Sequence, residues 1–234
     1  MVKGITLALI EVSLIFYLGY NLKKFPKFQN INGITFYWLL FTTITGIWEF
    51  SFLINYNLTC QMAYSLLQNH EHVWTRDYLL IEIFPLRFSK LFYAEYGAYA
   101  DREYMKPDNN WSRIIEGTHL IFCGLGCFLA LLLKKTEKKT EKEIEKEIEK
   151  QTINKYYLIF VSSAMSSQAM NSILYMVNYF HETKDSTNPN YNSTDFPMGN
   201  YLNNRPFMYI NILWTIMPLY VLLNLIYSFN KIRY

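Results

Sequence analysis

The chain has 234 residues, of which 51% are hydrophobic and 18% aromatic, and its mean hydropathy is close to zero. Its net charge of +3 is small and is divided among several polar segments, so the composition gives no support for nucleic-acid binding. The spacing of the three cysteines indicates neither a disulfide framework nor a zinc site.

The hydrophobic residues are concentrated in five runs separated by strongly polar segments. About 20 apolar residues at roughly 1.5 Å each cross a hydrocarbon core of about 30 Å, so each run is long enough for one transmembrane helix. The sequence therefore predicts an all-α membrane protein, a single domain over residues 1–234, with five transmembrane helices and a long lumenal loop between helices two and three.

The first run, 4–21, contains Glu11. Because Lys3 precedes an apolar stretch, a signal peptide is an alternative, but Glu11 interrupts the stretch and no small-x-small cleavage site follows it. An uncleaved first helix is the prediction. An ionised group in hydrocarbon costs several kcal/mol, so Glu11 is expected to bond between helices, to reach toward the membrane surface, or to serve a functional site.

The second run, 34–55, contains Thr45 and Glu49. It is followed by the predicted lumenal loop, 56–113. Aromatic and basic residues interleave there over 73–84, which is typical of a segment lying at the membrane interface. We expect this loop to cover the lumenal end of the helices.

The third run, 114–133, contains Glu116 and His119. These residues are three positions apart, so they share one face of a helix. Cys123 and Cys127, one turn apart in the same run, are interpreted as small packing residues. No metal site is indicated.

Segment 134–155 is a low-complexity stretch in which Glu and Lys recur at a four-residue period. Such pairs favour a solvated helix by a few tenths of a kcal/mol each. The segment is interpreted as a charged cytosolic insertion that either extends the neighbouring helices or is flexible.

The fourth run covers 156–180 and the fifth 207–229. In the fifth run Asn211 and Trp214 share a helical face, and Pro218 one turn beyond permits a kink. These polar and aromatic residues add a second inward face to that of the third run.

Basic residues follow the first, third and fifth runs, at 23–27, 134–155 and 231–233. The positive-inside rule makes these segments cytosolic, which predicts a lumenal N-terminus and a cytosolic C-terminus. Glycosylation patterns of the form Asn-x-Ser/Thr begin at Asn57, Asn110 and Asn192. All three fall in predicted lumenal segments, which agrees with this orientation.

With this orientation, the polar residues of the runs fall about 5 to 14 Å from the lumenal ends, at about 1.5 Å per residue. They are Glu11, Glu49, Glu116, His119, Asn171, Asn211 and Trp214. A shared depth predicts that several of these side chains meet in one pocket below the lumenal surface.

Five motifs occur in order between Thr42 and Leu223. They are an Asp-x-x-Tyr segment at 101–104, an Asp-Asn-aromatic stretch at 108–111, the pair Glu116-Gly117, Gln168 with Leu174-Tyr175, and Asn-x-Leu-Trp-x-x-x-Pro at 211–218. With these motifs and spacings the chain resembles the emopamil-binding protein family of sterol Δ8-Δ7 isomerases, within the wider EXPERA-domain group.

The resemblance implies an isomerase of the endoplasmic reticulum membrane that moves a ring double bond from Δ8 to Δ7 without a cofactor. An acid adds a proton to one alkene carbon, which gives a tertiary cation, and a base removes a proton from the neighbouring carbon. Burial favours the neutral form of a carboxyl group, as a proton donor requires. On this basis Glu116 is expected to be proton donor or relay, Glu49 its electrostatic partner and Asn211 the residue that orients them.

The aromatic face of Trp214 is expected to stabilise the buried cation by about 2 kcal/mol. The residues expected to contact substrate are Trp214, Thr118, Thr45, Gln168 and Tyr175. The expected partners are a sterol or another hydrophobic small molecule and membrane lipid, and a homodimer is left open.

One departure from the family concerns the histidine that stands four residues before the glutamate of span two. Here Thr45 occupies that position before Glu49. His119 stands where the family has threonine, three residues after the span-three glutamate. Our hypothesis is that His119 faces the same pocket and restores a basic group, so it is counted among the catalytic residues.

Two other functions remain as alternatives. The first is a non-catalytic relative that binds sterols or amphiphilic amines, which the missing histidine favours. The second is a small transporter or trafficking chaperone, although the absence of inverted repeats counts against a transporter. Asn211 and His119 have a structural alternative as well, because polar residues often hydrogen-bond between membrane helices.

Overall fold

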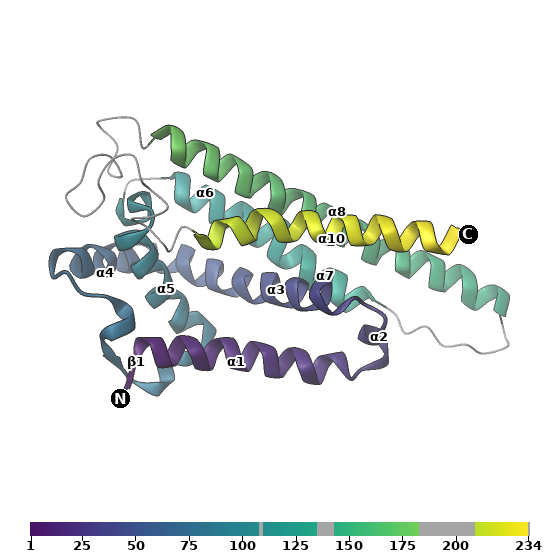
Figure 1. Ribbon diagram of the computed structural model, residues 1–234, viewed down its shortest axis with the longest axis horizontal. Helices are drawn as coiled ribbons and strands as arrows, with labels where there is room; N and C mark the ends of the chain where they lie inside the picture. Colours follow the sequence, from purple (N-terminus) through teal and green to yellow (C-terminus); the bar gives the residue numbers. More distant parts are fainter. Residues whose placement is uncertain (108–109, 135–142, 183–208, 234) are drawn as a thin grey trace.

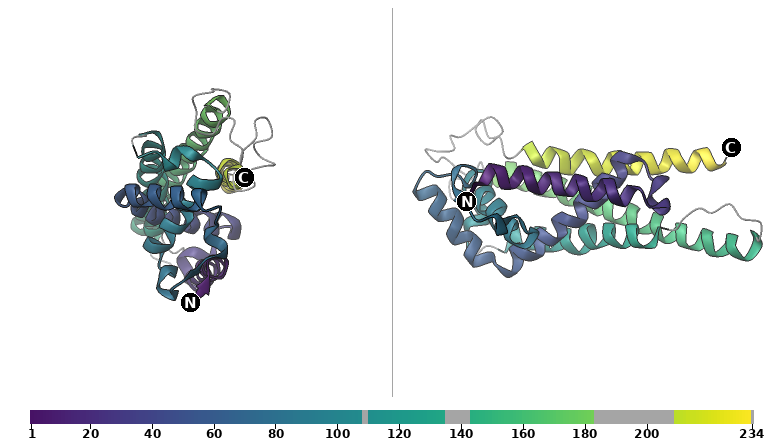
Figure 2. Two further views of the ribbon diagram at one scale, coloured as in Figure 1. Left: turned by 90° about the vertical axis from the view of Figure 1, so that its left-hand side faces the viewer. Right: turned by 90° about the horizontal axis from the view of Figure 1, so that it is seen from below.

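The computed structural model describes residues 1–107, 110–134, 143–182 and 209–233. These residues are almost entirely helical. The long helices run side by side in an elongated bundle, with the N-terminus at one end and the C-terminal end of α10 at the other (Figures 1 and 2).

Four stretches of the described residues are long and apolar enough to cross a membrane. They are α1 (Gly4–Lys23), α3 (Gly33–Ile54), the continuous stretch Trp111–Leu133, and Ile210–Tyr227 in α10 (Ile210–Arg233). The mostly helical fold and these four stretches fit the predicted all-α, multi-pass membrane protein.

The fourth predicted run, 156–180, lies inside one long helix, α8 (Glu143–Glu182). This helix does not meet the same requirement of length and apolar composition, so the structure does not establish a fifth membrane span. It also contains the second half of the charged segment, which continues the helix from 143 to 155. The first part of that segment, 135–142, lies outside the described residues.

The connection over 56–113 is more structured than the predicted loop. It contains α4 (Tyr56–Gln68) and α5 (Pro85–Tyr99). Between and after them lie the short 3-10 turns η1 (Val73–Thr75), η2 (Leu80–Ile83) and η3 (Arg102–Met105). The buried residues of α4 recur at three- and four-residue spacing, which gives it one apolar face. The helices form because this face packs against the rest of the connection.

The start of α1 is fixed to this connection by a two-stranded antiparallel sheet. The strands are β1 (Val2–Lys3) and β2 (Asp77–Tyr78). The ammonium group of Lys3 bonds the carboxylate of Asp77 at 2.8 Å, and the amide of Gly4 donates to the carbonyl of Arg76 at 3.0 Å. At its other end α1 turns into the short helix α2 (Pro26–Gln29).

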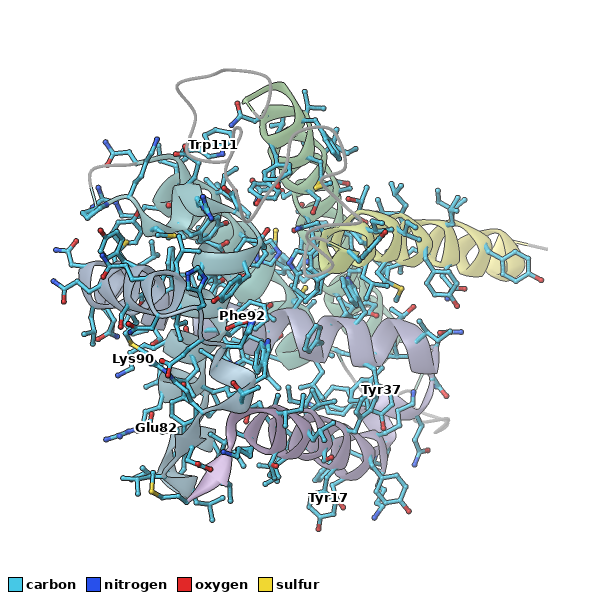
Figure 3. All side chains as sticks on the ribbon, turned by 60° about the vertical axis from the view of Figure 1, so that its left-hand side comes forward. Tyr17, Tyr37, Glu82, Lys90, Phe92 and Trp111 are labelled. Atoms are coloured by element: carbon cyan, nitrogen blue, oxygen red, sulfur yellow. The ribbon has the colours of Figure 1, made fainter. Side chains whose placement is uncertain are left out.

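Helix α3 lies at the centre of the bundle. Its apolar stretch is 61% buried, compared with 22% for α1 and 17% for α10. The outer helices expose apolar side chains; Tyr17 of α1, for example, points away from the bundle, whereas Phe92 of α5 lies on the inner side (Figure 3). This distribution suits helices that face lipid.

The third stretch is not a uniform α-helix. It consists of α6 (Trp111–Thr118), a π-helical segment η4 (His119–Gly124) and α7 (Leu125–Leu133). Gly124 of η4 meets Gly46 of α3 so closely that an added Cβ on Gly124 would lie 2.9 Å from the Gly46 Cα. The two glycines therefore bring α3 and η4 into backbone contact, as small residues do in membrane bundles.

Candidate functional site

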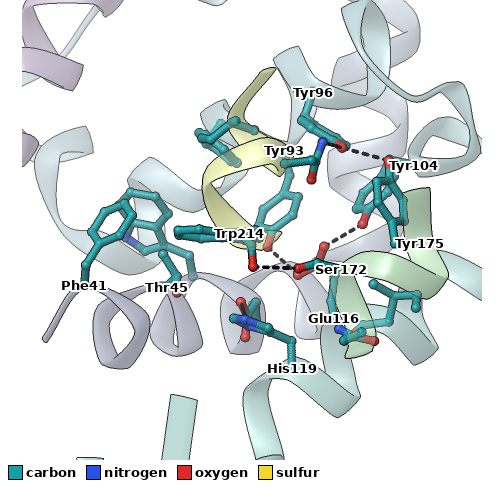
Figure 4. Close-up of a pocket in the computed structure, with 17 residues that line it drawn as sticks. Phe41, Thr45, Tyr93, Tyr96, Tyr104, Glu116, His119, Ser172, Tyr175 and Trp214 are labelled. Carbon is teal, nitrogen blue, oxygen red and sulfur yellow. Dashed lines mark hydrogen bonds and ion pairs between the residues drawn. The ribbon is translucent and has the colours of Figure 1, made fainter. Parts of the chain in front are cut away.

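A single pocket lies where α3, α5, α6 and η4, α8 and α10 meet (Figure 4). It offers about 680 Å³ of space free of atoms, counting the part that is open to the surroundings. Aromatic and apolar side chains form most of its wall, including Phe41, Trp48, Phe92 and Ile115. An apolar pocket with a few polar groups is the usual form of a small-molecule site.

Seven of the nine residues predicted for the site line this pocket. They are Thr45, Glu49, Glu116, His119, Tyr175, Asn211 and Trp214. The other two do not line it: the hydroxyl of Thr118 donates to the carbonyl of Ile115 at 2.9 Å, and Gln168 is fully buried on the far side of His119. The structure thus brings the residues together, while their roles in binding and catalysis stay predictions.

Glu49 and His119 form a buried pair across α3 and η4. The distance between Nδ1 of His119 and Oε1 of Glu49 is 2.5 Å, and the two residues are only 4% and 1% exposed. The other oxygen of Glu49, Oε2, is also buried and has no hydrogen-bond partner among the described residues. A buried carboxylate oxygen without a partner is an exception in a folded protein.

Behind His119 the hydrogen bonds continue through Gln168 to Trp38. The indole N–H of Trp38 donates to Oε1 of Gln168 at 2.9 Å. The side-chain nitrogen of Gln168 lies 2.9 Å from Nε2 of His119 and 3.4 Å from the hydroxyl of Thr42. Both ring nitrogens of His119 are therefore engaged, one toward the pocket wall and one toward the core.

Glu116 is held by two tyrosines from the connection over 56–113. The hydroxyl of Tyr93 in α5 donates to Oε2 at 2.7 Å, and that of Tyr104 in η3 donates to Oε1 at 2.5 Å. Burial, followed by the nearby carboxyl group of Glu116, raises the pKa of both tyrosines well above its usual value. The two phenols therefore stay neutral. Each oxygen of Glu116 has one tyrosine hydroxyl beside it.

Asn211 belongs to a separate chain of hydrogen bonds. Its amide donates to the hydroxyl of Tyr96 at 2.9 Å, which is 2.7 Å from the hydroxyl of Tyr175. Tyr175 in turn donates to Oδ2 of Asp101 at 2.6 Å. Asn211 thus bonds Tyr96, whose ring packs against that of Tyr104, and its expected role of orienting Glu116 and Glu49 stays a prediction.

Trp214 stands beside the histidine of the buried pair. Its ring lies nearly parallel to that of His119, with centroids 6.1 Å apart, and meets the rings of Trp38 and Phe41 edge-on. The indole therefore presents an electron-rich surface within the polar part of the pocket.

Sequence reasoning missed Tyr93, Tyr96 and Tyr104, because all three lie in the segment taken for a loop. One signal was present: Tyr93 and Tyr96 are three residues apart, the spacing of one helical face, and Tyr104 ends the Asp-x-x-Tyr motif. Glu11 lies on α1 and does not line the pocket. It is buried, and its Oε1 has no hydrogen-bond partner among the described residues.

The arrangement supplies two carboxyl groups, one imidazole and several phenols inside an apolar cavity. Such groups can add protons to and remove protons from an apolar molecule. In the part of the chain that the structure describes, no group of three or more His, Cys, Asp or Glu side chains could hold a metal ion.

Comparison of the chain with protein-family models, with curated proteins and with solved structures finds no match in any of the three. The resemblance to sterol isomerases therefore depends on the motifs of the sequence. The chemical argument depends on the geometry of the pocket.

Proposed function

We propose that this protein is a sterol isomerase of the endoplasmic reticulum membrane that moves a ring double bond from Δ8 to Δ7. The observation that carries the proposal is the meeting of Glu116 with the Glu49–His119 pair in one aromatic-walled pocket. Three titratable groups in an apolar cavity are what proton addition and removal on a hydrocarbon skeleton require.

In the proposed reaction Glu116, bonded to two tyrosine hydroxyls, adds a proton to one alkene carbon. The electron pair of the double bond forms the new C–H bond and leaves a cation on the other carbon. The Glu116 carboxylate left by the first step then takes a proton from the neighbouring carbon, whose C–H electron pair forms the new double bond, and Glu116 returns to its acid form. Glu49 and the ring face of Trp214 stabilise the cation between these two steps.

The position of His119 supports this proposal in spite of Thr45. His119 meets Glu49 from a different helix, so a basic group stands beside the span-two glutamate although the neighbouring turn of α3 lacks it. We propose that this pair replaces the His/Glu pair of the family.

The proposed topology has five membrane spans, with α8 as the fourth, a lumenal N-terminus and a cytosolic C-terminus. An odd number of spans requires the two ends of the chain on opposite sides of the membrane. The N-terminus and the C-terminal end of α10 lie at opposite ends of the bundle (Figure 1), which supports an odd number.

The direct test is turnover by the purified protein in lipid nanodiscs. A Δ8 sterol is supplied in D₂O, and the product is analysed by mass spectrometry for a Δ7 bond and for a deuteron taken from solvent. We expect both, and we expect Glu116→Gln to lower kcat by about 10²- to 10⁴-fold, the range for loss of a general acid. Glu71→Gln, on the exposed surface, is the matched control and should turn over normally. Full activity of Glu116→Gln would exclude this residue as the acid.

A second function, binding without catalysis, is favoured by one observation: both oxygens of Glu116 already accept hydrogen bonds. A carboxylate held in this way suits binding of a sterol hydroxyl or an amine as well as proton transfer. Saturable sterol binding with no Δ7 product in the same nanodiscs would select this function. Sterol-independent flux across vesicles would instead indicate a transporter.

A further inference from the structure

The two ring nitrogens of His119 have chemically different neighbours. Nδ1 faces the carboxylate of Glu49 at 2.5 Å, and Nε2 faces the side-chain amide of Gln168 at 2.9 Å. All three residues are buried, with Gln168 fully enclosed. In the neutral imidazole the proton is on either Nδ1 or Nε2, and the groups next to these nitrogens determine which of them carries it.

Trp38 fixes the orientation of the Gln168 amide. An indole N–H can donate but cannot accept, and it lies 2.9 Å from Gln168 Oε1. This end of the amide must therefore be the carbonyl oxygen. The NH₂ end then points toward His119 and Thr42, where the hydroxyl of Thr42 at 3.4 Å can accept its second hydrogen.

An amide NH₂ offers hydrogens and no lone pair, so Nε2 of His119 must be the acceptor in this contact. A proton on Nε2 would face the hydrogens of the amide in a buried site, at the cost of a lost hydrogen bond. The remaining proton is on Nδ1, where it donates to Oε1 of Glu49. His119 in this arrangement is neutral.

We propose that Trp38 and Gln168 are positioning residues that hold His119 as the neutral tautomer with its proton on Nδ1. When Glu49 is ionised, its Oε1 accepts from His119, and its buried Oε2 has no hydrogen-bond partner among the described residues. A doubly protonated His119 would cancel the charge of Glu49, whereas the neutral ring leaves it uncompensated by His119. In a low-dielectric pocket that charge attracts a cation strongly.

The consequence for catalysis rests on the proposed function, because a fixed negative charge is useful to a carbocation intermediate. The tautomer itself does not depend on the reaction. It can be measured without substrate, so failure of the proposed function and failure of this inference are distinguishable.

The test is nitrogen NMR of the full chain in nanodiscs with labelled histidine. The chain has four histidines, and the His119→Gln variant identifies the His119 signals by their loss. We expect one protonated ring nitrogen in His119, and we expect it to be Nδ1. A proton on Nε2, or protons on both nitrogens, overturns the inference even if sterol turnover is intact.

Two variants test the cause of the tautomer. Gln168→Glu keeps the shape but replaces the donating NH₂ by an accepting oxygen, so both nitrogens of His119 should become protonated. Trp38→Phe removes the donor that orients the amide, so the amide can flip and present its oxygen to Nε2, and a fraction of His119 should carry protons on both nitrogens. The exposed Gln61→Glu is the matched control and should leave the His119 signals unchanged. An unchanged His119 spectrum in folded Gln168→Glu and Trp38→Phe proteins would show that these residues do not set the tautomer.

Discussion

Thr45 is one of two pocket residues, with His119, that differ from the motifs of the family this chain resembles. The surroundings of Thr45 indicate what a histidine there would do. Its hydroxyl donates to the carbonyl of Thr42 at 3.0 Å, and its side chain lines the pocket one turn before Glu49. Oε1 of Glu49 is already bonded to His119. A histidine at position 45 would therefore add a second imidazole beside Glu49, which His119 already contacts.

We expect Thr45→His to lower sterol kcat/KM by about tenfold, which is about 1.4 kcal/mol of transition-state stabilisation. The added ring takes pocket volume and competes with His119 for Glu49. Thr45→Val, which keeps the shape and removes only the hydroxyl, should change the rate much less. A rate gain in Thr45→His would mean that the present site is impaired.

Glu11 is a buried acid outside the pocket, and its hydrogen bonds to the described residues are incomplete. Its carboxyl group is buried, its Oε1 has no partner in the part of the chain that the structure describes, and such an oxygen costs about 1 kcal/mol or more. We therefore expect Glu11→Leu to raise stability by about 1 kcal/mol, or about 2 to 4 °C in Tm for a chain of this size. Thermal unfolding in nanodiscs measures this. A fall in Tm would indicate that Glu11 has a stabilising partner.

The polar members of the pocket could be predicted from the sequence because a charged or amide side chain in an apolar run marks an inward face. Position along a run gives the depth of a residue but only roughly its direction around the helix axis. Gln168 illustrates this: the resemblance places it in contact with substrate, yet its side chain points behind His119. The tyrosines of α5 could not be predicted because their segment has no long apolar run.

Among the helices, the contact between α3 and η4 decides the geometry of the site. Gly46 and Gly124 meet on these two helices, as do Glu49 and His119. The π-helical turn begins at His119, and π-helical segments recur at functional sites. It could not be predicted from the run 114–133, because a π-helix depends on packing against neighbouring helices and has no period of its own in the hydrophobic pattern.

Gly124→Ala should force α3 and η4 apart, because the new Cβ would lie 2.9 Å from the Gly46 Cα. We expect a loss of about 1 to 3 kcal/mol in stability, the usual effect of overpacking. We also expect the His119 NMR signals to shift as its contact with Glu49 lengthens. Gly33→Ala, where an added Cβ meets nothing within 4 Å, is the matched control and should do neither. Equal Tm values for the two variants would contradict the proposed role of this contact.

At the scale of the whole molecule, the basic segments collect at one end. The turn from α1 into α2, the C-terminal end of α7 and the C-terminal end of α10 all lie at the end away from β1 and α4 (Figures 1 and 2). The side chain of Lys23 donates there to the carbonyl of Phe28 at 2.7 Å, next to the C-terminus of α1. This agrees with the orientation proposed from charge.

The orientation can be tested by protease protection in sealed microsomes. A tag after the C-terminus should be digested without detergent. A tag inserted at His70, an exposed turn residue with a positive φ of 52°, should be protected until detergent is added. The reverse pattern would invert the proposed topology, and digestion of both tags would show an even number of spans between position 70 and the C-terminus, which contradicts the three proposed there.

The central place of α3 has a consequence for biogenesis. Glu49 leaves the ribosome 70 residues before His119, and Thr42 precedes Gln168 by 126. Until the later helices are inserted, the carboxyl group of α3 has none of these partners in the bilayer. We therefore expect the nascent helix to stay beside the insertion machinery, and chains truncated before residue 119 to be recognised and degraded as orphaned membrane segments.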